Sequence, residues 1–130
     1  NHSGLTKQQT SLSLTVGGHD SAHGLTRLQL GEQAIYLLDE RLNGQTTQLR
    51  CYIFANEISL TTTEPVDSTI VNQLKAEITK ITSHQHQVLV QLLCEGQEFF
   101  ASISSYSLEK LKLAPKQSVY MQFKASAVRT

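Results

Sequence analysis

Apolar and polar side chains alternate along most of this chain, and the alternation predicts a series of short β-strands. Strict alternation over about four to eight residues is typical of a strand that buries one face. It is clearest at 11–16, where Leu12, Leu14 and Val16 share a face. Similar runs follow at 25–30, 34–38, 49–53, 76–81, 88–92, 98–103 and 119–123. Many short strands separated by turns favour a barrel or a sandwich, so the predicted fold class is all-β.

Short segments rich in glycine or polar residues separate these runs and predict turns. Turns are expected at 17–20, 31–33, 43–44, 84–86 and 95–97. One helix is expected, at 105–112. Leu108 and Leu111 would face the core at a helical spacing, and Ser107 is the expected N-cap.

The second half of the sequence repeats the pattern of the first half. Residues 49–58 lie over residues 119–128 with apolar side chains at the same inward positions. The turn at 31–33 corresponds in the same way to the turn at 95–97. This internal duplication predicts two copies of one small barrel. We expect a disordered linker or a cloning remnant at 1–10, a first module at 11–62, a linker at 63–68 and a second module at 69–130.

Composition narrows the function classes. The 130 residues include 11 basic and 11 acidic side chains, so the net charge is zero with histidine neutral. Non-specific nucleic-acid-binding proteins usually have a basic excess, which argues against that class. No apolar run approaches the roughly 20 residues of a membrane span, and the first residues show no signal-peptide pattern. Cys51 and Cys94 lie in apolar alternating runs and are expected to be buried thiols, with a disulfide as the alternative.

Several segments are similar, in order and in spacing, to one bacterial protein family. Residues 19–28 resemble the HD-x-A-Y-G-L-T-R-L segment, and residues 55–60 the A-R-D-V-S-L segment, of the ATP-binding subunit of molybdate ABC transporters. Similarity to the Mop module of the TOBE family covers residues 69–74, 101–104, 108–113 and 123–128. The chain therefore resembles the C-terminal di-mop regulatory domain of that subunit, over residues 11–130.

This resemblance implies a fold of two OB-like, five-stranded barrels with the short helix in the second. It implies a cytoplasmic domain that is peripheral on the inner face of the cell membrane through the transporter, without direct membrane insertion. The implied partners are a second copy in a homodimer, the ATPase domain of the same subunit and, through it, a membrane permease, but no nucleic acid. The implied ligand is molybdate or tungstate, with no covalent cofactor.

The chain itself is not expected to be an enzyme. It contains no G-x-x-x-x-G-K-[ST] motif, the glycine-rich loop that cradles nucleotide phosphates. It is therefore not expected to hydrolyse ATP alone. The full-length parent implied by the resemblance would be an ABC-type molybdate-transporting ATPase.

The resemblance also implies an oxyanion site in the second repeat. An oxyanion needs hydrogen-bond donors and a modest positive field rather than a nucleophile or a base. The family's site residues correspond here to Thr69, Asn72, Ser104, Lys124, Ala125 and Ser126. One position departs from the family pattern, because Val71 stands where the family has an arginine. That change removes a planar fork of donors suited to oxyanions.

The first repeat retains less of this pattern. Phe54 stands in the place of Lys124, and Asn56 in that of Ser126. A pocket in the first repeat would therefore need a cation from Arg50 or from a partner chain.

The histidines fall into two groups, His19 with Asp20 and His23, and His84 with His86. A metal site needs three or four convergent ligands. Surface loops are therefore the favoured interpretation, and no metal site is predicted.

Phe99 and Phe100 are adjacent and so point to opposite faces of a strand. At least one is predicted to point outward. Packing on the sister barrel or on a second chain is favoured there over stacking on a nucleic-acid base.

The predicted function is that of a regulatory and dimerisation domain of a molybdate or tungstate importer ATPase subunit, with the oxyanion as a candidate ligand. Two alternatives stay open. One is a purely structural dimerisation module without a ligand. The other is an OB-type nucleic-acid-binding domain, which the zero net charge disfavours.

Overall fold

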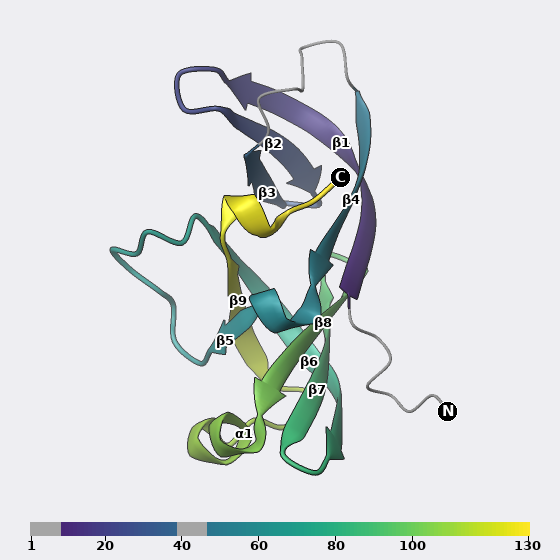
Figure 1. Cartoon of the computed structure of the whole chain (residues 1–130), viewed down its shortest axis with the longest axis vertical. Helices are drawn as coiled ribbons and strands as arrows, with labels where there is room; N and C mark the ends of the chain where they lie inside the picture. The colour runs from purple at the N-terminus through teal and green to yellow at the C-terminus, as the bar shows by residue number, and fades with distance from the viewer. Residues whose placement is uncertain (1–8, 39–46) are drawn as a thin grey trace.

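The computed structural model describes residues 9–38 and 47–130, and shows a protein built mostly from strands (Figure 1). Residues 1–8 of the predicted linker and the predicted turn at 43–44 lie outside the described residues. The strands are β1 (Gln9–Asp20), β2 (Leu25–Leu30), β3 (Gln33–Leu38), β4 (Gln48–Phe54), β5 (Ser59–Thr61), β6 (Asn72–His84), β7 (Gln87–Cys94), β8 (Gln97–Ser104) and β9 (Ser118–Phe123). The helices are η2 (Ala55–Glu57), α1 (Ser105–Leu111) and η3 (Ala125–Ala127), of which α1 is an α-helix and the others are 3-10 turns.

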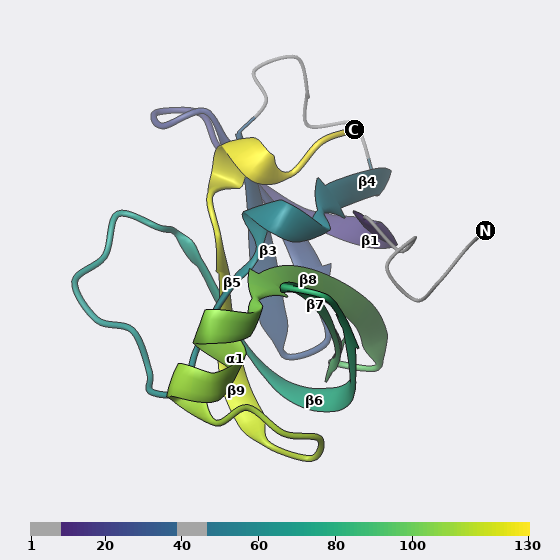
Figure 2. The same cartoon turned by 60° about the horizontal axis from the view of Figure 1, so that its bottom comes forward.

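The strands form two curled antiparallel sheets, one in each half of the molecule (Figures 1 and 2). Their orders are β3-β2-β1-β4 and β5-β9-β6-β7-β8. Inward side chains alternate with outward ones, as on β2, where Thr26, Leu28 and Leu30 are buried. The predicted all-β, OB-like class is confirmed, and so is the short helix in the second half.

The two sheets share one backbone design. The register of β1 with β2 shifts at Gly17, and the register of β6 with β7 shifts at Thr79, at the same point of each repeat. A β-bulge of this kind adds one residue and bends the strand. The duplication seen in the sequence is therefore present in the backbone as well.

The predicted turn at 17–20 is wrong. These residues continue β1, and the turn lies at 21–24. The glycine at the bulge accommodates a close approach instead, because a Cβ on Gly17 would lie 2.6 Å from Nη1 of Arg27. The strand also starts early, so that Gln9 and Thr10, expected in the linker, belong to β1.

The two halves exchange their ends. β5 follows the first sheet in sequence but pairs with β9 of the second, with Ser59 opposite Gln122. Reciprocally, the N–H of Arg129 donates to the carbonyl of Tyr52 at 2.9 Å, and the N–H of Tyr52 donates to the carbonyl of Arg129 at 2.8 Å. Each sheet is therefore extended by residues from the other half of the chain, including β5 from the expected first module at 11–62.

Two buried polar side chains each join an edge strand of one sheet to an inner strand of the other. Oδ1 of Asn72 on β6 accepts from the N–H of Tyr36 on β3 at 2.7 Å, and Nδ2 of Asn72 donates to the carbonyl of Tyr36 at 2.9 Å. In the second contact, the N–H of Phe100 on the edge strand β8 donates to Oγ1 of Thr10 on the inner strand β1 at 2.9 Å. Thr10 and Asn72 occupy the same register position in their own sheets. We call this matched pair of contacts the edge clasps.

The core crosses from one half to the other. Phe99 is fully buried, and Phe100 packs in a second cluster with Leu89 and with Ala55 of the first half. Phe100 points to the face of β8 opposite to that of Phe99, but it is still buried by other residues of the same chain. The expected packing on the sister barrel is therefore confirmed.

Both cysteine thiols are free and buried. Burial raises the pKa of Cys51 to about 11 and that of Cys94 to about 12. In the described part of the chain, no helix has the length and the apolar character needed to cross a membrane.

Candidate functional site

Three of the six predicted site residues lie together where β9 ends. Lys124 is the N-cap of η3, and Ala125 and Ser126 are the first two residues of that turn. The N–H of Ala127 closes the turn by donating to the carbonyl of Lys124 at 3.0 Å. Lys124 and Ser126 are exposed, whereas Ala125 is buried, so the two side chains available to a ligand are an ammonium and a hydroxyl.

Lys124 and Ser126 line a surface pocket of about 250 Å³, which we call the Lys124 pocket. The other lining residues are Glu57, Ser59, Ile70, Gln122, Phe123 and Ala127. Glu57 and Ser59 come from the exchanged end of the first half, so both halves build this pocket. The ammonium, the hydroxyls and the amide are donors that an oxyanion can accept from.

The segment before β6 divides between surface and core. Thr69 is exposed beside Ile70, but only Ile70 lines the Lys124 pocket. Val71, in the place of the family's arginine, is 43% exposed. Asn72 is 1% exposed, and its amide bonds to the backbone of Tyr36 in an edge clasp. While those bonds are made, the Asn72 amide does not face the Lys124 pocket.

Ser104 lies in a different pocket. It is the N-cap of α1, where its Oγ accepts from the N–H of Ser107 at 3.1 Å. The expectation that Ser107 caps this helix is wrong, because the helix begins two residues earlier, at Ser105. Ser104 lines a hollow of about 210 Å³ between β5, β8 and α1. The structure therefore brings Lys124, Ala125 and Ser126 together and places Ser104 apart from them.

An ion pair that sequence reasoning missed lies at the edge of the Lys124 pocket. Nη1 of Arg129 bonds to Oε1 of Glu57, and the hydrogen bond raises the pKa of the guanidinium above its ordinary value. The two residues are 72 positions apart, so no local pattern connects them. Aligning the repeats gives the available signal, because it places Arg129 over Ser59 and so in the exchanged strand.

The counterpart of the Lys124 pocket in the first repeat carries different side chains. Phe54 takes the place of Lys124 and packs against Tyr52, with ring centroids 5.7 Å apart. The guanidinium of Arg129 lies 4.6 Å from the centroid of the Phe54 ring. Arg50 instead lines a separate groove of about 470 Å³. The cation at this place is therefore Arg129 from the other half of the same chain.

The histidines of the first hairpin make local contacts. Nδ1 of His23 lies 2.8 Å from Oδ2 of Asp20, and this hydrogen bond lowers the pKa of the carboxyl. Nδ1 of His19 lies 3.0 Å from Oγ1 of Thr26. No group of three or more His, Cys, Asp or Glu side chains in the described ranges is arranged to hold a metal ion.

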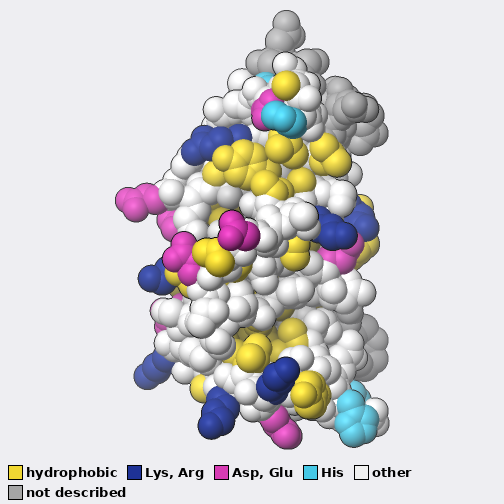
Figure 3. Space-filling view, turned by 90° about the vertical axis from the view of Figure 1, so that its left-hand side faces the viewer, with side chains coloured by type: hydrophobic (Ala, Val, Ile, Leu, Met, Phe, Trp, Pro, Cys, Tyr) yellow, Lys and Arg dark blue, Asp and Glu magenta, His cyan; other side chains and the backbone are white. Residues whose placement is uncertain are grey.

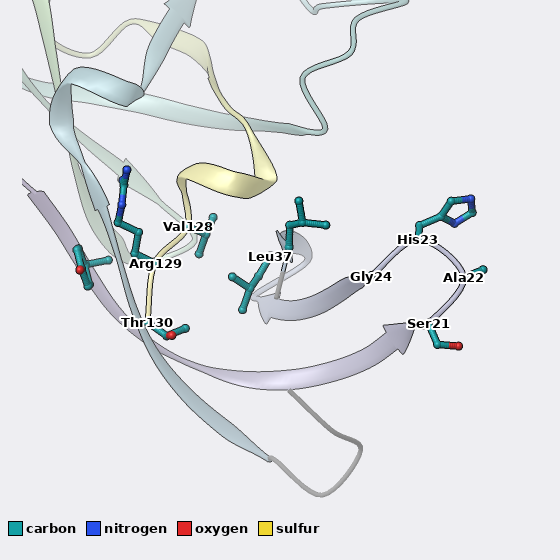
Figure 4. A pocket seen from close by; sticks show the side chains of 10 residues that line it. Ser21, Ala22, His23, Gly24, Leu37, Val128, Arg129 and Thr130 are labelled. Carbon is teal, nitrogen blue, oxygen red and sulfur yellow. The ribbon is translucent and has the colours of Figure 1, made fainter. Parts of the chain in front are cut away.

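A larger groove, of about 990 Å³, opens in the first half between the β1–β2 hairpin and residues 128–130 (Figure 4). Leu37 and Val128 face each other across it, whereas His23 points away from it. Arg129 at its edge is bonded to Glu57. Figure 3 shows apolar side chains gathered on the upper half of one face, which is the half formed by the first sheet. The groove and this face are thus less suited to an anion than the Lys124 pocket.

Known proteins resemble this chain in sequence along most of its length. The molybdenum import ATP-binding protein ModC of Haemophilus influenzae is 33% identical over 126 residues, which are 96% of this chain and 35% of that protein. ModC of Mannheimia succiniciproducens is 35% identical over 90% of this chain and 33% of its own length. ModC of Escherichia coli is 32% identical over 95% of this chain and 36% of its own length. The chain thus spans about a third of the length of these curated relatives.

A solved structure shares the architecture. The cytoplasmic molybdate-binding protein ModG, in a crystal form with molybdate bound, matches with a TM-score of 0.73 and 19% sequence identity. The match covers 91% of this chain and 92% of that one, and at this identity it shows the fold alone. Residues 68–130 match the TOBE domain family. Over those residues, therefore, the chain is similar to a TOBE domain.

Proposed function

We propose that this chain is the regulatory and dimerisation domain of a molybdate or tungstate importer ATPase subunit, and that it holds the oxyanion reversibly in the Lys124 pocket. The supporting observation is that pocket itself, a cation and several neutral donors around about 250 Å³. It occurs in a chain that is similar to molybdenum import ATP-binding proteins along nearly its whole length.

Binding in this pocket needs no chemical step. Molybdate and tungstate are tetrahedral dianions, and the Lys124 ammonium supplies the opposite charge. The hydroxyls of Ser59 and Ser126 and the amide of Gln122 supply neutral donors around it. Charge-assisted hydrogen bonds of this type hold an oxyanion without a nucleophile, a base or a metal ion.

The domain would act as part of a larger protein. Its partners would be a second copy, the ATPase domain of the same subunit and, through it, a membrane permease on the cytoplasmic side. Leu38, at 48% exposed, and the apolar patch of Figure 3 offer surface for such contacts.

A purely structural role is the second candidate, and two observations favour it. The amide of Asn72 and the hydroxyl of Ser104 are both engaged in holding the fold. Val71 supplies no donor where the family has an arginine. In this alternative the exposed ammonium of Lys124 is simply solvated.

Isothermal titration calorimetry of the full chain with molybdate, tungstate and sulfate separates these functions. We expect heat with the first two anions and at least a roughly tenfold loss of affinity in Lys124→Gln, because one charge-assisted contact is removed. Lys80→Gln, at an exposed lysine on β6, is the matched control and should bind as the wild type does. No heat with any anion leaves the structural role. A salt-dependent shift with single-stranded nucleic acid would favour the OB-type nucleic-acid-binding alternative.

A dimerisation role has its own measurement. Sedimentation velocity over a range of concentrations should show a monomer–dimer equilibrium. A chain that stays monomeric at the highest soluble concentration would contradict this part of the proposal.

A further inference from the structure

The Lys124 pocket contains an acidic side chain as well as a basic one. Glu57 lines it together with Lys124, although a carboxylate repels the oxyanion that the lysine attracts. Two opposite unit charges on one small pocket would cancel most of its positive field. The carboxylate of Glu57 is also bonded to the guanidinium of Arg129. The charge balance at the pocket therefore depends on this third side chain.

Arg129 is held in place by several independent contacts. Its backbone pairs with Tyr52 on β4, and its guanidinium lies over the ring of Phe54. Nη1 also lies 3.4 Å from the carbonyl of Ala127. The side chains of Glu57 and Arg129 are only about a third exposed, at 35% and 37%. The ion pair is therefore part of the interface between the two halves, and not an isolated contact between solvent-exposed side chains.

The Glu57–Arg129 ion pair is close enough to the pocket for its charges to act on a bound anion. At physiological ionic strength the Debye length is about 8 Å, which is comparable with the width of so small a pocket. A carboxylate on its wall is thus not screened from a dianion inside. Since the ligand carries two charges, it responds twice as strongly as a monovalent ion to any change in the wall charge.

We propose, on the basis of the function proposed above, that Arg129 is a positioning residue for the oxyanion site. Its guanidinium neutralises the charge of the Glu57 carboxylate, so that the Lys124 ammonium gives the pocket a net positive charge. The residue that makes the second-repeat pocket anion-selective is then one that docks on the first repeat. The pocket should therefore bind the oxyanion more tightly when residues 128–130 are docked on β4 than when they are not. By linkage, the bound oxyanion stabilises that docking in return.

The test is a charge-swap cycle on the full chain, read by titration calorimetry with sodium molybdate. Arg129→Gln leaves Glu57 unpaired and should weaken binding by about fivefold to tenfold. Glu57→Gln leaves Arg129 as a second cation and should strengthen binding, with a steeper salt dependence. The double variant Glu57→Gln/Arg129→Gln restores the wild-type charge sum and should bind within about threefold of the wild type.

The double variant separates charge from folding. It loses the same guanidinium contacts with Phe54 and Ala127 as Arg129→Gln alone. If those contacts mattered only for the fold, the two variants would bind equally weakly, which would overturn the inference. Arg50→Gln, in a separate groove, is the matched control and should change nothing.

The outcomes also distinguish this inference from the function on which it rests. Wild-type binding that is unaffected by Arg129→Gln rejects the positioning role and leaves the oxyanion function standing. No molybdate binding by the wild type, under conditions where circular dichroism shows the native fold, rejects both. Binding that Arg129→Gln weakens and the double variant restores supports both.

Discussion

The Lys124 pocket of the second repeat and its counterpart at Phe54 in the first share a backbone but not a charge pattern. Each lies where a sheet strand runs into a 3-10 turn, and each receives a strand end from the other half. The second repeat carries its cation on its own strand end. The first repeat has an aromatic ring there and receives Arg129 through the exchange. Duplication thus preserved the geometry, while the side chains at the exchanged ends diverged.

The same comparison applies to the edge clasps. Asn72 makes two hydrogen bonds to the backbone of Tyr36, whereas Thr10 makes one, with the backbone of Phe100. Both side chains are essentially fully buried, at 1% and 0% exposed. A buried side chain in a shared structural position is therefore retained as a hydrogen-bonding group even where its chemical type differs.

The largest effect is expected at the clasps. Asn72→Ala should lower the free energy of unfolding by about 3 kcal/mol, because two backbone groups of Tyr36 lose buried partners. Thr10→Ala should cost about 1 to 2 kcal/mol for one lost partner. Urea unfolding followed by circular dichroism measures both. Asn56→Ala, at an exposed asparagine, is the control and should stay within about 0.5 kcal/mol of the wild type. Equal costs at Asn72 and Thr10 would show that the two clasps are equivalent despite their chemistry.

The hairpin turns give the next comparison. Gly31 and Glu95 begin equivalent turns with similar φ values, 56° and 50°, and the turns pack on each other. A Cβ on Gly31 would lie 2.8 Å from the Cβ of Glu95, so only one of the two positions has room for a side chain. Gly31→Ala should therefore cost about 2 kcal/mol. Gly96→Ala, where a Cβ meets nothing within 4 Å, should cost about 1 kcal/mol of backbone strain.

Thermal or urea unfolding of these two variants measures the difference. If Gly31→Ala is no worse than Gly96→Ala, the close packing of the two turns has no energetic weight. Adding Glu95→Gly to Gly31→Ala should recover part of the loss, because glycine removes the whole side chain at position 95, including the Cβ that blocks the new methyl group.

Among the described residues, only the second repeat has an α-helix, and Ser104 is its N-cap. A variant at Ser104 can therefore distinguish a structural role from a ligand-binding role. Ser104→Ala should lower the free energy of unfolding by about 1 kcal/mol through loss of the N-cap of α1. Molybdate affinity should stay within about twofold of the wild type, because Ser104 lies outside the Lys124 pocket. A large loss of affinity with unchanged stability would instead make Ser104 a ligand.

The smallest effect is a pH dependence at the contact between the turns. The N–H of Glu32 and the amide of Gln33 donate to Glu95 and hold the pKa of its carboxyl below the ordinary value of 4.5. A lowered folded-state pKa means that this stabilisation is complete above the unfolded-state value and is lost as pH falls through the folded-state value. Scanning calorimetry from pH ~5 to ~3 should show a shallower fall of Tm in Glu95→Gln than in the wild type. Parallel slopes would exclude the contribution, and Glu64→Gln in the loop before β6 is the control.

Local alternation was enough to predict most strands, because each one buries one face. It could not predict the exchange of ends, since the polarity pattern of Ser59–Thr61 is the same whichever sheet it joins. Asn72 did carry a signal. It shares the inward face of β6 with Leu74 and Ala76, and a polar residue in that register is typical of a buried hydrogen-bonding group.

The remaining errors have similar causes. The glycines at 17–18 are compatible with both a turn and a bulge, and pairing with β2 decides between them. Ser104 and Ser107 are both competent N-caps, and the end of β8 selects the first. Arg129 had no local signal at all, because its partners Tyr52, Phe54 and Glu57 belong to the other half of the chain.

The exchange of ends also dictates when this protein can fold during its synthesis. The backbone N–H and carbonyl of Tyr52, on the outer side of β4, have no partner until Arg129 has left the ribosome. The hydroxyl of Thr10 likewise has none until Phe100, 90 positions away, is made. Contacts between such distant parts of a sequence close slowly, because the loop entropy is lost before the contacts form. The first half therefore cannot mature ahead of the second, as the leading domain of a nascent chain usually does. Its unfinished sheet edge stays open until the second half arrives, so the rate of elongation through residues 62–129 determines how long that edge is exposed to other chains.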